Sequence, residues 1–222
     1  MTTTQPHKKQ PNKKRALPVF WLVLIGSIFG FLLILLFQPT REAIDDSHLP
    51  WNAQFDDSGK LHALGLTVHH STLQDAMTLY GKDVEVKMFS ALDESNKSLE
   101  AYFPVMYIGS IKAALALKLE ASQTELDAIY ELGKNVTINT TGTREIELYS
   151  FEVGKLLSKK ISSVTLVPRN HLTERAIQMR FGEPDRKELQ SDNLPHWFFD
   201  ALGLEMIIDE NGPEALQYTT TP

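Results

Sequence analysis

The stretch IKAALALKL, residues 111–119, alternates between two kinds of side chain. Its odd-numbered positions are all apolar: Ile111, Ala113, Leu115, Leu117 and Leu119. Lys112 and Lys118 occupy even-numbered positions. Because successive side chains of a β-strand point to opposite faces of the sheet, this period of two predicts a strand with one buried and one solvated face. Such a pattern is typical of an antiparallel sheet with one wet face.

Other strands are expected on both sides of this one. Asp56, Asp57, Ser58 and Gly59 form a turn sequence that predicts an opening hairpin between two apolar segments. Further short apolar or alternating runs, bounded by turn residues, predict strands at residues 84–89, 99–107, 145–148, 161–167, 197–199, 204–208 and 215–218.

Short amphipathic helices are expected between the strands, at residues 73–80, 123–132, 151–159 and 172–181. The sequences STLQ at 71–74 and SQTE at 122–125 match the capping box, which predicts Ser71 and Ser122 as N-caps. Asn170 is expected to cap the last helix. Glycine ends two of the helices, after an aromatic residue each time, and positive φ angles are expected there.

An internal repeat emerges when Gly81 is aligned with Gly182. Thr72 then falls on Thr173, and Tyr80 falls on Phe181. Each copy has a short helix that leads into antiparallel strands. The predicted fold class is therefore α+β, with an N-terminal transmembrane helix followed by two tandem units of short helices packed on antiparallel sheet. The units are expected at residues 51–133 and 134–222, and one continuous mixed sheet is the alternative.

The segments AIQMRFGEP (176–184) and GLEMIID (203–209), with Gly212 and LQY (216–218), resemble the repeat of the small outer-membrane assembly lipoproteins and that of the β-lactamase inhibitor proteins. The resemblance implies helices against an antiparallel sheet and a role in binding other proteins. LPW (49–51), STLQDA (71–76) and LEAYF (99–103) resemble uncharacterised single-span envelope proteins of gammaproteobacteria, which implies a location but no active site.

Residues 19–37, VFWLVLIGSIFGFLLILLF, contain no charged residue. About 20 apolar residues in a helix cross a bilayer core, so a transmembrane helix is predicted at residues 18–38. A cleavable signal peptide is disfavoured because no small-residue cleavage site follows. Trp21 is expected to anchor the helix at the interface, and Gly26 with Gly30 forms a GxxxG pattern that would let two helices pair as a weak homodimer.

Charge predicts how the chain is oriented. Residues 1–41 hold six of the 22 Lys and Arg residues and none of the 28 acidic residues. Basic flanks stay in the cytoplasm, so residues 1–17 are expected to be a disordered cytoplasmic tail. Residues 39–50 would be a stalk, and the rest would be periplasmic at a bacterial inner membrane. Residues 42–222 carry a formal charge of −12 (16 basic against 28 acidic), which argues against nucleic acid as a partner.

The sequence offers little for catalysis. It has no cysteine, HExxH, GxSxG, SxxK or P-loop, so disulfides, thiolate metal sites and common nucleophiles are absent. No enzyme activity, cofactor or metal is predicted. The predicted function is a membrane-anchored interaction module that binds an unidentified envelope protein through a sheet face or a loop. A small-ligand sensor or carrier is the alternative, with the ligand between the two units. The partner surface is left unassigned.

Overall fold

The computed structural model describes residues 23–24, 27–31, 46–139 and 142–220. Contacts divide the chain into two units, Met1–Ala43 and Ile44–Pro222. The second unit contains, in chain order, η1 (Asp46–His48), η2 (Pro50–Asn52), β1 (Gln54–Phe55), β2 (Leu61–Ala63), β3 (Leu66–Thr67), α2 (Leu73–Tyr80), β4 (Glu85–Ser90), β5 (Ser98–Ile108), β6 (Ile111–Leu119), α3 (Gln123–Glu131), β7 (Asn135–Ile138), β8 (Arg144–Glu147), α4 (Ser150–Leu156), β9 (Ile161–Pro168), α5 (Glu174–Phe181), β10 (Arg186–Leu189), β11 (Pro195–Phe199), η3 (Asp200–Leu202), β12 (Leu204–Ile207) and β13 (Ala215–Tyr218).

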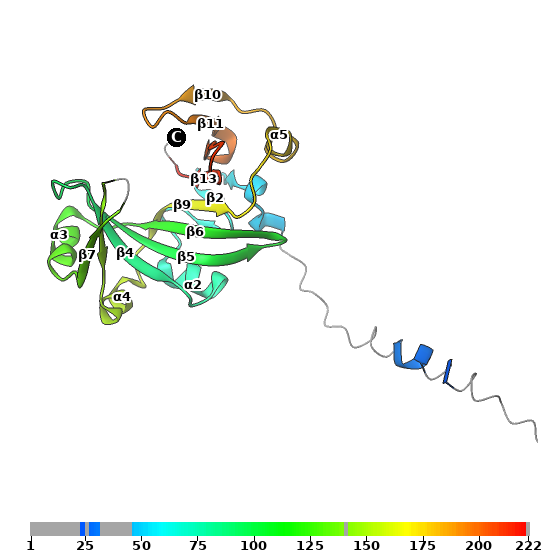
Figure 1. Cartoon of the computed structure of the whole chain (residues 1–222), viewed down its shortest axis with the longest axis horizontal. Helices are drawn as coiled ribbons and strands as arrows, with labels where there is room; N and C mark the ends of the chain where they lie inside the picture. The colour runs from blue at the N-terminus through cyan, green and yellow to red at the C-terminus, as the bar shows by residue number, and fades with distance from the viewer. Residues whose placement is uncertain (1–22, 25–26, 32–45, 140–141, 221–222) are drawn as a thin grey trace, which may run out of the picture. The chain divides into compact units, whose positions relative to one another are not determined.

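Ten of these strands form one antiparallel sheet in the order β10-β11-β12-β13-β9-β6-β5-β4-β8-β7 (Figure 1). The alternating stretch at 111–119 is β6, near the middle of the sheet. It pairs with β5 on one side and with β9 on the other, as Leu115 opposite Leu166 illustrates. The prediction of an antiparallel sheet with one wet face is confirmed.

The predicted fold class is nevertheless wrong in its division into two tandem units. β6 comes from the first expected unit and β9 from the second, and they pair along nearly their whole length. This joins both copies of the helix-and-strand repeat into one sheet. The physical reason is that a lone sheet edge leaves backbone donors and acceptors unpaired, and here the two inner edges satisfy each other.

One face of the sheet is covered from β4 to β11. The register places a continuous row of side chains there, all of them buried: Val86, Ala101, Leu117, Val164, Tyr218, Leu204 and Phe199. The aromatic rings of the repeat pack on this inner face. Tyr80 meets Phe103 edge to face at 6.1 Å, and Phe181 meets Phe199 at 5.8 Å, so the aromatic residue at the end of each helix packs on a strand of the sheet.

Between these helices the inner face is covered by the segment before α2. Its three-stranded sheet, β1-β2-β3, turns between β2 and β3 through Leu64 and Gly65, which both have positive φ angles. The Tyr80 hydroxyl donates to the Leu64 carbonyl, and the buried Tyr218 hydroxyl donates to the Pro50 carbonyl at 2.8 Å. The start of the described second unit is thereby fixed to its last strand.

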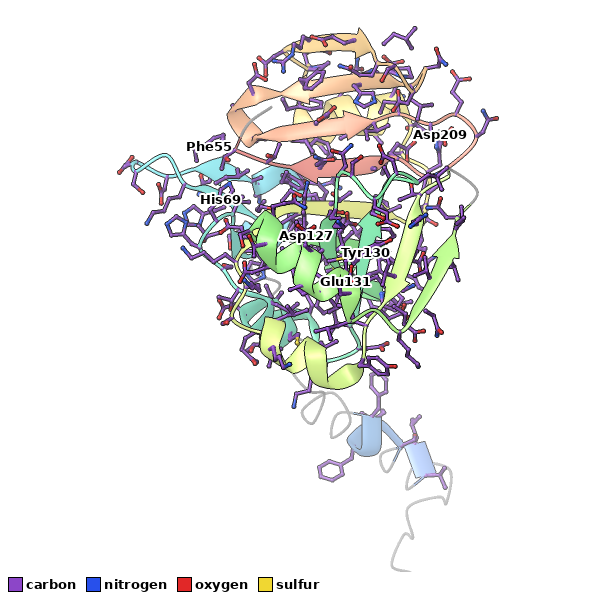
Figure 2. All side chains as sticks on the ribbon, turned by 90° about the vertical axis from the view of Figure 1, so that its left-hand side faces the viewer. Phe55, His69, Asp127, Tyr130, Glu131 and Asp209 are labelled. Atoms are coloured by element: carbon purple, nitrogen blue, oxygen red, sulfur yellow. The ribbon has the colours of Figure 1, made fainter. Side chains whose placement is uncertain are left out.

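α3 closes the end of the sheet near β7 and β8, and Figure 2 shows its Asp127, Tyr130 and Glu131. Lys97 donates to Asp127 at 2.8 Å, and Arg144 donates to the Tyr130 hydroxyl at 2.8 Å. These contacts join the helix to the start of β5 and to β8.

The helix ends agree in part with those predicted from the sequence. Gly81 and Gly182 have φ angles of 101° and 84°, so the predicted positive φ angles are confirmed. The Ser122 capping box is confirmed as well. At α2 the box is shifted by one residue, from Ser71 to Thr72 with Asp75, because the Ser71 hydroxyl accepts from the Thr67 amide instead. α5 is capped by Thr173 rather than by Asn170.

The predicted transmembrane helix is wrong. Within residues 18–38 the structure describes residues 23–24 and 27–31, which are helical, and the others lie outside the described residues. No helix in the described part of the chain combines the length and apolar character of a membrane span. The predictions that the chain is a membrane protein, that it has a transmembrane helix and that it is single-pass are therefore withdrawn.

Candidate functional site

The second face of the sheet, called the open face below, carries none of the described helices. The register lines up one row of its side chains across eight strands: Glu85, Tyr102, Ala116, Thr165, Gln217, Glu205, Phe198 and Arg186. In this row only Phe198 is buried. The open face is therefore mostly solvated, whereas its inner-face counterpart is core.

The longest strand, β5, exposes apolar side chains on the open face. Tyr102 is 36% exposed, Val105 48% and Tyr107 65%. The pairing of β5 with β6 is irregular between Phe103 and Met106, so two residues of β5 lie opposite one residue of β6. A β-bulge re-aims the side chains around it and is frequent beside functional sites. Here it lies among the exposed apolar side chains of the strand.

Carboxylates dominate the open face next to Tyr102. Lys87 Nζ lies 2.8 Å from Glu145 and 3.2 Å from Glu85, and the register places Lys87 between Glu100 and Glu147. The hydrogen bond to Glu145 raises the pKa of Lys87, although burial opposes the shift. Lys118 lies opposite Glu100 and Lys134 lies 3.8 Å from Glu147, so three lysines stand among these four glutamates and this part of the face keeps one net negative charge.

One histidine between two carboxylates marks the other end of the open face. His196 Nδ1 lies 2.5 Å from Glu205 Oε1, and His196 Nε2 lies 3.0 Å from Asp192 Oδ2. Burial lowers the pKa of His196, but the hydrogen bonds to Glu205 and Asp192 together outweigh it and the net shift is upward. Because both partners are acceptors, the protonated ring is the form that satisfies them. The Arg186 guanidinium covers the Phe198 ring at 4.0 Å.

A cavity of about 580 Å³ opens between Tyr102 and the turn that joins β12 to β13, and His171 lines it. Glu214, fully buried, accepts the Leu172 amide at 2.9 Å through Oε2. Its Oε1 lies 2.6 Å from His171 Nδ1, outside hydrogen-bond angles. The buried carboxylate thus fixes the position of the loop beside Tyr102. Figure 2 shows Asp209 on the same turn.

Lysines gather at a second cavity, of about 640 Å³, lined by Lys97, Lys118, Lys159 and Lys160. Two of them are neutralised, because Lys97 contacts Asp127 at 2.8 Å and Lys159 contacts Glu125 at 2.6 Å. The remaining two are exposed on the surface. This cavity therefore lacks a buried polar group that would define a ligand.

The sequence-predicted site residues lie elsewhere or are not described. Trp21 and Gly26 lie outside the described residues. Gly30 is described, with no atom within 4 Å of an added Cβ, and its role in helix pairing stays a prediction. Among the described residues no group of His, Cys, Asp or Glu is arranged to hold a metal ion. Sequence reasoning left the partner surface unassigned. Alternation along β5 could have placed Tyr102 on the face opposite Phe103, whereas Tyr107 reaches that face only through the bulge between Phe103 and Met106.

Aromatic residues in strands are expected to fill the core, and four of the five at positions 102–103 and 197–199 do. Phe103, Trp197 and Phe199 are buried, and Phe198 is buried although it lies on the open face. Tyr102 departs from this interpretation because it is partly exposed. No family model matches the chain, and no match is found among the curated proteins or the solved structures.

Proposed function

We propose that the second unit is a non-catalytic interaction module that binds a partner protein through the open face. The observation that carries this proposal is the row of exposed apolar side chains, Tyr102, Val105 and Tyr107, on a face that the described helices leave uncovered. Tyrosine is enriched at protein interfaces because it buries a large rigid surface and keeps a polar hydroxyl.

The charges around this row specify the partner further. Glu85, Glu100, Glu145 and Glu147 surround Lys87, and residues 42–222 carry a formal charge of −12. Opposite charge across an interface speeds association and selects partners. Lys112 lies opposite Tyr107, so the glutamates flank only the Tyr102 end of the row. The expected partner therefore presents an apolar centre with basic side chains beside that end, and binding should weaken as salt is added. The location in the bacterial envelope stays a prediction, and the proposal includes no membrane anchor.

The experiment is site-specific photo-crosslinking of the full chain in cells that express it. A photoreactive phenylalanine analogue replaces Tyr107 in one variant and Met179, which is 75% exposed on α5, in the matched control. A specific partner should crosslink at position 107 and not at 179. A Tyr102→Ala variant of the first chain should lose the crosslinked product, since the neighbouring anchor is removed.

Two results would count against the proposal. Equal crosslinking from 107 and 179 would show a surface without preference for the open face. At about 0.5 M salt the Debye length falls to a few ångströms. A crosslinked product at position 107 that survives both Tyr102→Ala and this salt concentration would show that neither the tyrosines nor the charges select the partner.

A further inference from the structure

A small cavity lies on the covered side of the sheet, away from the open face. It has a volume of about 210 Å³ and is enclosed between α5, η2 and the strands β6, β9 and β13. Figure 1 shows α5 beside the strands of the C-terminal part of the sheet. The floor of the cavity consists of Leu166, Ile177 and Leu216, each at most 1% exposed.

The size and lining of the cavity define what fits. A dry apolar cavity of about 150 Å³ binds benzene, so 210 Å³ accommodates a substituted benzene ring. Drug-sized ligands and nucleotides require about 300–1,000 Å³ and are too large. Trp51 and Phe181 form an aromatic wall, with their rings edge to face at 6.1 Å. The interior thus favours one flat apolar group.

The rim of the cavity is polar on one side. Arg180 lines it, and its guanidinium carbon lies 4.5 Å from the centre of the Trp51 ring. Arg180 has no ion pair with any described residue, unlike Arg144, which contacts Glu94 at 2.6 Å, and Arg186, which contacts Asp200 at 2.8 Å. Ser110, exposed at the tip of the β5–β6 hairpin, adds a hydroxyl to the rim.

We propose that this cavity binds a small aromatic carboxylate, with the ring on the Leu166–Ile177–Leu216 floor and the carboxylate at Arg180. A guanidinium fork matches a carboxylate in geometry and charge. The contact of Arg180 with the Trp51 ring holds the guanidinium at the mouth of the cavity. An anionic substituent on a ring buried in the cavity would lie at this mouth. This site is independent of the open face, because it lies on the other side of the sheet.

The test is a titration of the full chain with phenylacetate and, separately, with its uncharged analogue ethylbenzene. Binding is followed by tryptophan fluorescence, since Trp51 forms the wall, and by the methyl NMR signals of Ile177 and Leu216. Saturable shifts confined to these groups are expected for both probes. Arg180→Met should weaken phenylacetate binding at least tenfold and leave ethylbenzene binding within about twofold.

Two further variants complete the test. Arg175→Met removes a charge from the same helix outside the cavity lining and should change neither affinity. Ala176→Leu extends a lining side chain into the cavity and should abolish both signals while circular dichroism shows an intact fold. The proposal is overturned if phenylacetate produces no saturable shift, if Arg175→Met weakens it as much as Arg180→Met, or if the filled variant still binds.

Discussion

Replacement of Gly182 with alanine isolates the cost of one backbone conformation. Gly182 ends α5 with φ 84° and ψ −165°, a region that is populated almost only by glycine. An added Cβ would meet no atom within 4 Å, so no steric clash contributes. The expected loss is therefore the conformational term alone, about 1–3 kcal/mol of unfolding free energy.

Gly154 provides the matched control. It lies inside α4, without a positive φ angle and again with nothing within 4 Å of an added Cβ. Alanine is favoured over glycine in a helix by roughly 0.5–1 kcal/mol, so Gly154→Ala should stabilise the fold. The same chemical change is thus expected to have opposite signs at the two positions.

Urea denaturation of both variants, followed by circular dichroism and tryptophan fluorescence, measures the two free energies. In thermal melts, a protein of this size shifts by about 2–4 °C per kcal/mol, so Gly182→Ala should lower the midpoint by about 2–12 °C. If Gly182→Ala remained within 0.5 kcal/mol of the parent, the glycine would not be required at the end of α5. If both variants lost stability equally, the effect would not come from backbone conformation.

Three further predictions concern the whole sheet and its charges. Tyr80→Ala and Phe181→Ala should each lower the midpoint of a single shared urea transition, because β6 and β9 join both halves, and a second transition in either melt would contradict one sheet. The folded pKa of His196 is raised, so its contribution to stability is fully present below about pH 6.5 and lost as pH rises through the folded pKa. His196→Gln should therefore flatten the decline in stability above pH 6.5, and an unchanged slope would contradict it. A chelator should leave the melting temperature of the full chain unchanged, and a fall of several degrees would reveal a structural metal.

Local sequence patterns predicted where the strands lie better than they predicted which strands pair with each other. The alternation at β6 set its faces correctly because one side chain in two must be buried, whatever the neighbouring strand is. The pairing of Leu115 with Leu166 joins residues about fifty positions apart, and no local signal encodes that choice. The repeat therefore suggested two separate units, whereas in the structure the edges of the two copies pair and form one sheet.

The predicted N-cap of α2 is wrong for a similar reason. Ser71 and Thr72 are both good N-caps by residue type, and tertiary contact decided between them, because the Ser71 hydroxyl is used by the Thr67 amide. Part of the candidate site could be predicted from the sequence. Strand alternation could place Tyr102 on the face opposite Phe103, but only the three-dimensional structure shows the bulge that brings Tyr107 to the same face and shows that no described helix covers it.

The position of β13 has a consequence for how the sheet is completed during folding. β13 is the last strand of the sheet in chain order, yet it lies between β9 and β12. Until residues 215–218 dock, β9 and β12 each present an unpaired edge, and the Pro50 carbonyl lacks the Tyr218 hydroxyl. A folding intermediate in which β13 is undocked would thus expose two adhesive edges at once, which makes the docking of this strand the step that protects the sheet from aggregation.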